Sequence, residues 1–288
     1  MLTDYHIHTE FSDDSHEPME KQIERAIELH LDEICFTDHV DYGIKKDWSE
    51  GNIQYRPGDG IGTSADSLEP IANVDYPAYF AKLHRMKEIY KDRIKIRQGL
   101  EFGMQTITVE PFQKLYDRYR DELDFVLLSM HQIDNLELWN QDFQKGKSQE
   151  EYNDRYYREI YDTMDMYKEY SILAHLDLVT RYDLNGRYPF EKVKGAIAEI
   201  LKLAIREDKG IEINTSSYHY GLSDTTPCRN ILELYKDLGG TIITTGSDAH
   251  DTRYLADHLT DAIDVLKEIG FKGFYTYERM IPSFHEWE

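Results

Sequence analysis

Short runs of apolar, often β-branched residues alternate along this chain with longer stretches in which apolar residues recur at helical spacing. The pattern predicts strands at 2–6, 33–37, 94–100, 125–129, 172–174, 211–214 and 241–245, with a further short strand at 274–277. A first helix opens at Pro18, and further helices are predicted at 77–90, 110–120, 150–168, 189–207, 229–238 and 256–268. Strands that alternate with amphipathic helices indicate an α/β fold, and 288 residues suit a one-domain barrel of parallel strands.

Two segments interrupt this alternation. Residues 41–73 are rich in Gly, Ser, Asp and Asn, and a loop of that length is typical of a lid, a binding loop or a disordered segment. Residues 132–146 are shorter and carry Trp139. The alternation resumes after each, so we predict a single domain over 1–288, with 41–73 as a candidate lid.

The excess of acidic over basic residues limits the kinds of partner that the protein can bind. Lys and Arg number 33 against 55 Asp and Glu, which gives a formal charge of −22. An acidic surface argues against nucleic acid, whose phosphates require basic side chains, and it suits a protein that holds cations. With only two cysteines the chain has no disulfide framework, and both are expected to be buried thiols of a cytoplasmic protein. No apolar run approaches the roughly 20 residues that span a bilayer, and the N-terminus does not resemble a signal peptide.

Histidines and carboxylates follow most of the predicted strands. The carboxyl ends of parallel barrel strands meet at one mouth, so residues distant in sequence come together there. Half of the twelve histidines lie at such ends, together with a glutamate and an aspartate. In strand order, these residues are His6, His8, His39, Glu101, His131, His175, Asp248 and His250.

Each histidine also has an ordinary structural interpretation, because a lone histidine in an α/β protein is usually a hydrogen-bonded polar group. We adopt that interpretation for His16, His30, His84, His258 and His285, which lie in helical, terminal or helix-flanking segments. His6 and His8 differ because residues i and i+2 of a strand point to the same face. Alone, His-x-His is a weak signal. Its repetition at the other strand ends makes a metal site the better interpretation.

The carboxylates admit two interpretations as well. Glu101 and Asp248 could belong to structural ion pairs, but few basic residues stand near them in sequence, and a buried carboxylate without a cation is costly. Asp38 is expected to orient a ligand or cap a turn, and the residues alone do not choose between Asp13 and Asp14. Imidazole and carboxylate without thiolate suit Zn, Mn or Fe.

The residues at these strand ends, in this order, resemble the PHP (polymerase and histidinol phosphatase) family. The resemblance covers nearly the whole chain. It rests on Asp4-Tyr5-His6-Ile7-His8-Thr9, Phe11-Ser12-Asp13-Asp14, Phe36-Thr37-Asp38-His39, Gly99-Leu100-Glu101, Ser129-Met130-His131, Ala174-His175-Leu176-Asp177 and Gly246-Ser247-Asp248-Ala249-His250. The segments 176–182 and 212–216 are similar to the histidinol-phosphatase branch of that family.

The resemblance implies a distorted (β/α)7 TIM-like barrel with a trinuclear metal centre, where the number of candidate ligands alone predicts two or three divalent ions. It also implies hydrolysis of L-histidinol phosphate, a small phosphate ester, in histidine synthesis. It implies that Asp14 joins the eight residues above as a metal ligand, and that Glu101 bridges the metals. The phosphate-binding arginine of the family matches Arg181. A second basic residue is expected after Asn214-Thr215-Ser216, where His219 stands in place of a common arginine. Substrate contacts are therefore expected from Arg181, His219 and Asn214.

The expected mechanism is in-line attack on phosphorus by a metal-bridging hydroxide. Arg181 would bind a phosphate oxygen, and Asp248 or His250 would protonate the departing alkoxide. For the amino and imidazole groups of the substrate, Asp134, Trp139 and Tyr218 are candidate contacts. The alternatives are a phosphatase or phosphodiesterase for another ester such as a nucleotide or sugar phosphate, a metal-dependent amidohydrolase, and a metal-binding module without activity.

Overall fold

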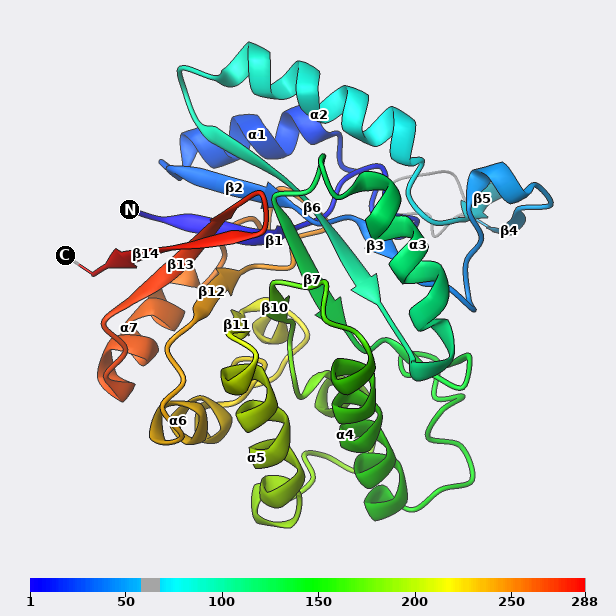
Figure 1. Ribbon diagram of the computed structural model, residues 1–288, viewed down its shortest axis with the longest axis vertical. Helices are drawn as coiled ribbons and strands as arrows, with labels where there is room; N and C mark the ends of the chain where they lie inside the picture. Colours follow the sequence, from blue (N-terminus) through cyan, green and yellow to red (C-terminus); the bar gives the residue numbers. More distant parts are fainter. Residues whose placement is uncertain (58–67, 288) are drawn as a thin grey trace.

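A computed structural model describes residues 1–57 and 68–287, and eight of its strands form one parallel sheet (Figure 1). Seven of them follow one another across the sheet in chain order. They are β1 (Thr3–Ile7), β2 (Glu33–Phe36), β6 (Lys95–Gly103), β7 (Phe125–Ser129), β10 (Ile172–Leu173), β11 (Gly210–Asn214) and β12 (Ile243–Gly246). All seven were predicted from the sequence, with ends that differ by up to three residues.

The sheet curls until its two edges meet. Just beyond β12, the amide of Asp248 donates to the carbonyl of His6 at 2.8 Å, and the amide of His8 donates to the carbonyl of Ala249 at 2.9 Å. Ile7 and Ala249 form a parallel bridge between β1 and the segment after β12. The sheet is therefore a nearly closed barrel, as predicted. Its first and last strands, β1 and β12, lie next to each other, so the residues that follow them lie at the same mouth.

The helices lie around the outside of the barrel, each after a strand of the sheet (Figure 1). They are α1 (Met19–Glu28), α2 (Tyr76–Tyr90), α3 (Val109–Tyr119), α4 (Gln149–Met166), α5 (Phe190–Arg206), α6 (Arg229–Asp237) and α7 (Leu259–Ile269). The sequence placed the start of α7 at Ala256, which is wrong. Ala256 and His258 have φ of 57°, a left-handed conformation that an α-helix does not continue through, so α7 begins at Leu259.

The segment 41–73 contains structure that periodicity did not reveal. Immediately before this segment, β3 (His39–Val40) pairs with β6 just beyond the end of β2. A short 3₁₀ turn, η1 (Trp48–Glu50), and an antiparallel pair, β4 (Gln54–Pro57) and β5 (Leu68–Ile71), follow and stand away from the barrel (Figure 1). Part of the predicted lid, 58–67, lies outside the described residues. The segment 132–146 likewise contains a small pair, β8 (Gln132–Ile133) and β9 (Leu136–Glu137).

Apolar side chains fill the barrel interior near its amino-terminal end. Tyr5, Cys35, Phe125, Leu127, Ile172 and Ala174 pack there with Tyr277. Tyr277 comes from β13 (Gly273–Glu278), which pairs with β14 (Ile281–Glu286), and its amide donates to the hydroxyl of Tyr5 at 2.8 Å. The C-terminal hairpin therefore closes the end of the barrel opposite the mouth, and a second apolar layer lies between the sheet and the helices.

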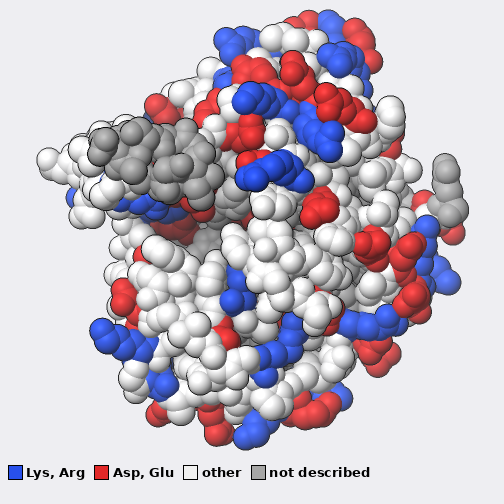
Figure 2. All heavy atoms as spheres, turned by 180° about the vertical axis from the view of Figure 1, so that it is seen from behind, with Lys and Arg blue, Asp and Glu red and all other residues white. Residues whose placement is uncertain are grey.

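Basic and acidic side chains are interspersed on the face of the molecule shown in Figure 2. Within the described part of the chain, every helix is too short or too polar to cross a membrane.

Candidate metal centre

Glu101, on β6, lies at the centre of the mouth, and each of its two carboxylate oxygens faces a different set of imidazoles. Its side chain is completely buried. Oε1 faces Nε2 of His175 at 2.9 Å and Nε2 of His131 at 3.2 Å. Oε2 faces Nδ1 of His39 at 2.9 Å, Nε2 of His6 at 3.2 Å and Nε2 of His8 at 3.5 Å. Glu101 therefore belongs to two of the groups of side chains that could hold a metal ion.

His6 and His8 point to the same side of β1, as their i, i+2 spacing predicts. Their Nε2 atoms lie 3.6 Å and 3.3 Å from Oδ1 of Asp248, across the seam where the barrel closes. The two imidazoles and the carboxylate form one group of potential ligand atoms that lie within 4.8 Å of one another. Closure of the sheet therefore brings together the first and last predicted ligand segments of the chain.

The predicted ligands form one cluster around Glu101. Its outer side consists of His39, His250 and Asp14. The Nε2 atoms of His39 and His250 lie 3.3 Å apart, and Oδ2 of Asp14 lies 3.5 Å from the first and 3.4 Å from the second. The Asp14 side chain is 46% exposed, the most open of the predicted ligands. Asp13 instead pairs with Lys45, so the geometry favours Asp14 over Asp13 at the cluster.

The described residues contain four overlapping groups that could hold a metal ion. They are His8, His39 and His250; His6, His8 and Asp248; His6, Glu101 and His175; and His39, Glu101 and His131. With Asp14 beside two of these histidines, all nine predicted ligands meet at one place.

The cluster leaves buried polar atoms that a cation would satisfy. Nε2 of His6, Nε2 of His8, Nδ1 of His39 and Oε2 of Glu101 are buried, and although the three nitrogens lie 2.9 to 3.5 Å from that oxygen, none of the four atoms is aligned for a hydrogen bond among the described residues. Unpaired buried polar atoms are costly, and here they converge on the same space. Imidazole nitrogens and carboxylate oxygens are ligands for Zn, Mn and Fe, so the residues present fit a site for divalent cations.

The pKa values of the clustered histidines also favour a site for cations. Burial lowers the pKa of an imidazole, yet the surrounding carboxylates outweigh burial and raise the pKa of His6 and His39, and that of His131 to about 9. Burial together with the neighbouring imidazoles of His250 and His39 lowers the pKa of His8. The carboxylates therefore stabilise positive charge at the cluster, and bound cations would supply that charge in place of protons.

A second layer of residues orients these imidazoles. Nδ1 of His6 lies 2.7 Å from Oε1 of Glu212 on β11, and Nδ1 of His131 lies 2.8 Å from Oδ1 of Asp41. A Cβ on Gly246 would lie 2.2 Å from Oε1 of Glu212, so the contact requires glycine there. Neither carboxylate was predicted from the sequence to have a role at the site. For Glu212 a signal was present, because Glu212 and Asn214 are polar at i and i+2 of an otherwise apolar strand.

The predicted substrate residues are only partly at the cavity that adjoins the cluster. That cavity holds about 370 Å³, and its walls include Arg181, Asp248, His250, Trp139 and Tyr220. Arg181 follows β10 in the 3₁₀ turn η3 (Leu178–Tyr182); its Nη2 donates to the hydroxyl of Ser216 and lies 3.4 Å from Oδ2 of Asp248. Its guanidinium carbon lies 4.4 Å from the ring centre of Tyr220.

His219 and Asn214 do not line that cavity. The ring of His219 stacks on Tyr254, with ring centres 4.3 Å apart. Asn214 is completely buried behind the cluster, where its Nδ2 donates to Oε2 of Glu212 at 3.1 Å and its Oδ1 accepts from the hydroxyl of Ser216 at 2.6 Å. In this geometry Asn214 supports neighbouring side chains, and the phosphate contact predicted for His219 stays a prediction.

Of the three candidate contacts for the rest of the substrate, only Trp139 lines the cavity. Asp134 pairs with Arg155 at 3.4 Å, and Tyr218 packs against His258, with ring centres 4.5 Å apart. Glu137, Arg56 and Tyr182 line the cavity and were not singled out by sequence analysis. These residues lie on β4, β9 and η3, outside the barrel sheet, in segments whose course the sequence pattern does not define.

The fold and the cluster together define a class: a parallel-stranded barrel whose mouth carries histidines and carboxylates that could hold divalent metal ions. The PHP domain family matches residues 4–216. The chain belongs to the PHP domain family.

The similarity to individual relatives extends over nearly the whole chain. The histidinol-phosphatase of Lactococcus lactis subsp. lactis is 31% identical over 287 residues, which cover 96% of this chain and 94% of the relative. A curated relative from Clostridium acetobutylicum is 26% identical and covers 98% of this chain and 99% of its own length. The crystal structure of the L. lactis histidinol phosphate phosphatase in complex with zinc, L-histidinol and phosphate is similar with a TM-score of 0.79 and 29% identity, covering 98% of each chain.

Proposed function

We propose that this protein is a metal-dependent phosphomonoesterase that hydrolyses L-histidinol phosphate to L-histidinol and phosphate. The observation that carries the proposal is the full-length similarity to the L. lactis enzyme, whose structure contains zinc, L-histidinol and phosphate. The cluster around Glu101 and the adjoining cavity support it, because they place candidate cation ligands and an arginine at one site.

The nine residues His6, His8, Asp14, His39, Glu101, His131, His175, Asp248 and His250 would hold two or three divalent ions, with zinc as the first candidate. Clustered divalent ions supply a hydroxide near neutral pH and offset the charge of phosphate oxygens. The residues of the chain would set the geometry: Glu101 presents an oxygen to each side of the cluster, and Glu212 and Asp41 fix two of the imidazoles.

Arg181 is the residue of the cavity wall best suited to hold a phosphate oxygen. Its guanidinium is almost completely buried, and it is held between Asp248, Ser216 and the ring of Tyr220, so its position is fixed before substrate arrives. A fixed, charged donor beside the reacting phosphate stabilises the transition state more than a mobile one does. Asp248 and His250, the predicted donors of a proton to the departing alkoxide, line the same cavity. Despite burial, His6, His8 and Arg181 lower the pKa of Asp248, whereas the carboxylates of Asp14 and Asp248 raise that of His250, so His250 is the better proton donor.

The outer part of the cavity would receive the histidinol portion of the substrate. Glu137 offers a carboxylate to the amino group, and Trp139 and Tyr220 offer ring faces to the imidazole. A cavity of about 370 Å³ is of the size that small-molecule sites have.

A phosphate-release assay on protein of measured metal content tests this proposal. L-histidinol phosphate would be compared with a nucleoside monophosphate, a sugar phosphate and a phosphodiester at equal concentration. We expect L-histidinol phosphate to have the highest kcat/KM, and we expect chelation to abolish turnover. Metal-loaded protein that prefers another ester of this panel would refute the substrate, and turnover that survives complete metal removal would refute the mechanism.

A further inference from the structure

Lys45 is a buried lysine that joins two parts of the cluster and to which the proposed mechanism gives no role. It lies five residues beyond the end of β3, where its amide donates to the carbonyl of Asp41 at 2.8 Å. Its side chain is 9% exposed. Its Nζ lies 2.8 Å from Oδ2 of Asp41 and also pairs with Oδ1 of Asp13, so one ammonium bridges two carboxylates from different segments.

Each of these two carboxylates is linked to a predicted ligand, one by a contact between side chains and the other by its position in the sequence. The other oxygen of Asp41, Oδ1, lies 2.8 Å from Nδ1 of His131, whose Nε2 faces Glu101. Asp13 immediately precedes Asp14, whose carboxylate faces His39 and His250. Lys45 therefore connects the segment after β1 to the segment after β7, at the part of the cluster that is most open.

The contacts of Asp41 leave little freedom for this arrangement to change. A Cβ on Gly103 would lie 1.8 Å from Oδ1 of Asp41 and 2.7 Å from Nδ1 of His131, so the pair fits only against glycine. Asp13 also receives Arg56, whose Nη1 lies 3.4 Å from its Oδ2. The ammonium of Lys45 thus sits in a closed set of contacts and not at a mobile surface.

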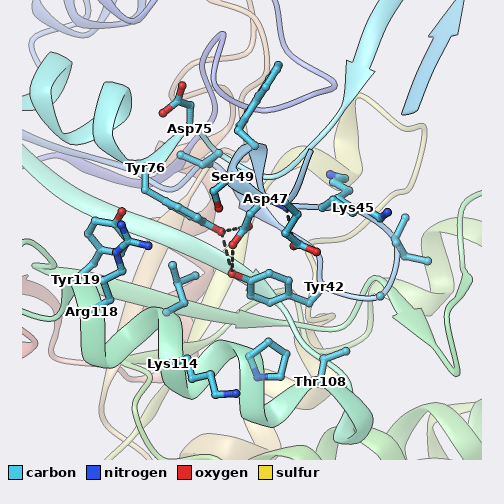
Figure 3. A pocket seen from close by; sticks show the side chains of 18 of the residues that line it. Tyr42, Lys45, Asp47, Ser49, Asp75, Tyr76, Thr108, Lys114, Arg118 and Tyr119 are labelled. Carbon is cyan, nitrogen blue, oxygen red and sulfur yellow. Dashed lines mark hydrogen bonds between the residues drawn. The ribbon is translucent and has the colours of Figure 1, made fainter. Parts of the chain in front are cut away.

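The segment that carries Lys45 is also held from its outer side, as Figure 3 shows. Asp47 accepts from the hydroxyl of Tyr42 at 2.9 Å and from that of Tyr76 at 2.8 Å. Asn73 donates to Asp47 at 2.9 Å and accepts from the amide of Asp41 at 2.9 Å. A cavity of about 730 Å³ lies on this outer side, and Lys45 lines both this cavity and the one beside the cluster.

We propose that Lys45 is a positioning residue that fixes the ligand-bearing segments at Asp14 and His131 relative to each other, so that the outer part of the cluster retains its cations. The inference rests on the proposed metal-dependent function. Residues behind metal ligands commonly change metal affinity or activity about 10- to 100-fold when they are replaced. Burial alone would lower the pKa of Lys45, but the carboxylates of Asp13 and Asp41 raise it, so the bridge stays charged.

The test compares the retention of metal in Lys45→Met, Asp13→Asn and Lys46→Met with that of the wild type. Lys46 is the matched control, because it is the neighbouring lysine, lines only the outer of the two cavities, and has no ion pair within the described residues. Metal per chain is measured by elemental analysis after dialysis against a graded series of chelator concentrations, without substrate present.

We expect Lys45→Met to lose at least one ion at a chelator concentration about tenfold or more below that of the wild type. Asp13→Asn should shift in the same direction and Lys46→Met should not shift. In metal-loaded protein, kcat for L-histidinol phosphate should also fall in Lys45→Met, because the ligands at Asp14 and His131 are displaced.

Folded Lys45→Met that retains its metal at the wild-type chelator concentration would overturn the inference. If Lys45→Met does not fold, Asp13→Asn decides, since it breaks the same bridge from the other side with a side chain of the same shape; wild-type retention there would also overturn it. If the wild type holds metal with the expected dependence on Lys45 but does not hydrolyse L-histidinol phosphate, the proposed substrate is refuted and the role of Lys45 stands.

Discussion

The Nδ1 atom of His6 lies 2.7 Å from Oε1 of Glu212, and both side chains are buried. This contact fixes the plane of the imidazole and directs its Nε2 atom toward Glu101 and Asp248. The second oxygen of Glu212 accepts from the amide of His175 at 3.0 Å, so one carboxylate orients the segments that carry two predicted ligands. Carboxylates behind metal-binding histidines set both the tautomer and the direction of the ring.

Replacement of Glu212 by glutamine should weaken metal binding while leaving every predicted ligand in place. Glutamine keeps the shape but offers one acceptor oxygen where His6 and His175 now use two. We expect metal affinity or kcat to fall about 10- to 100-fold, measured by chelator competition and phosphate release. Glu199→Gln, which affects only an exposed pair with Lys202, is the control. Equal metal affinity and kcat in Glu212→Gln and the wild type would exclude this orienting role.

Glu101→Gln should have a larger effect, because it removes charge from the centre of the cluster. The carboxylate faces imidazoles with both oxygens, so cations on either side depend on it. We expect metal content to fall by at least one ion per chain in elemental analysis, and turnover to be lost with it. Glu110→Gln, at an exposed pair with Lys114, should retain the wild-type metal content. An unchanged metal content in Glu101→Gln would remove Glu101 from the ligand set.

Arg181→Met should separate phosphate binding from metal binding. Arg181 contacts Asp248 but is not itself a candidate ligand, so the metal content should stay near that of the wild type. Loss of one fixed donor to a transition-state oxygen reduces kcat by about 10²- to 10³-fold in comparable sites. Steady-state kinetics with L-histidinol phosphate measure this, with Arg229→Met on the exposed face of α6 as the control. A wild-type kcat/KM in Arg181→Met would show that the arginine does not bind the phosphate.

The stability of the metal-free protein should fall as the pH rises from 7 to 9. The carboxylates of Glu101 and Asp41 outweigh burial and raise the pKa of His131 to about 9, above the roughly 6.5 of an unfolded chain. A raised pKa means that the folded state binds the proton more tightly. The stability that this proton contributes is complete below the unfolded pKa and is lost as the pH rises through the folded one.

In the metal-loaded protein, a bound cation would replace that proton, so stability should change much less over the same range. Urea unfolding at several pH values, with and without chelator, provides the comparison. Metal-free protein that is more stable at pH 9 than at pH 7 would contradict the assignment of protonated histidines to the cluster.

The pattern of apolar and polar residues predicted the strands of the barrel but not the structure of the segments between them. Seven of the eight strands of the barrel sheet were predicted, because they are short, largely apolar runs set apart by amphipathic helices; the two-residue β3 was not. The hairpin of β4 and β5 was not, since its strands are only four residues long, β4 is largely exposed, and β5 buries Glu69 while it exposes Leu68. Arg56 reaches the cavity from this hairpin, and whether the hairpin acts as a lid stays a prediction.

The amino-acid sequence by itself determined which side chains would meet at the mouth of the barrel. The reason is that parallel strands end at one rim, so the residue that follows each strand is placed there whatever the loops do. Only the tertiary structure decided which atoms face one another. Glu212 lies 206 positions from His6, Lys45 lies 32 from Asp13, and His219 turns onto Tyr254. Such pairings depend on sheet closure and on the packing of loops, for which a single sequence carries no periodic signal.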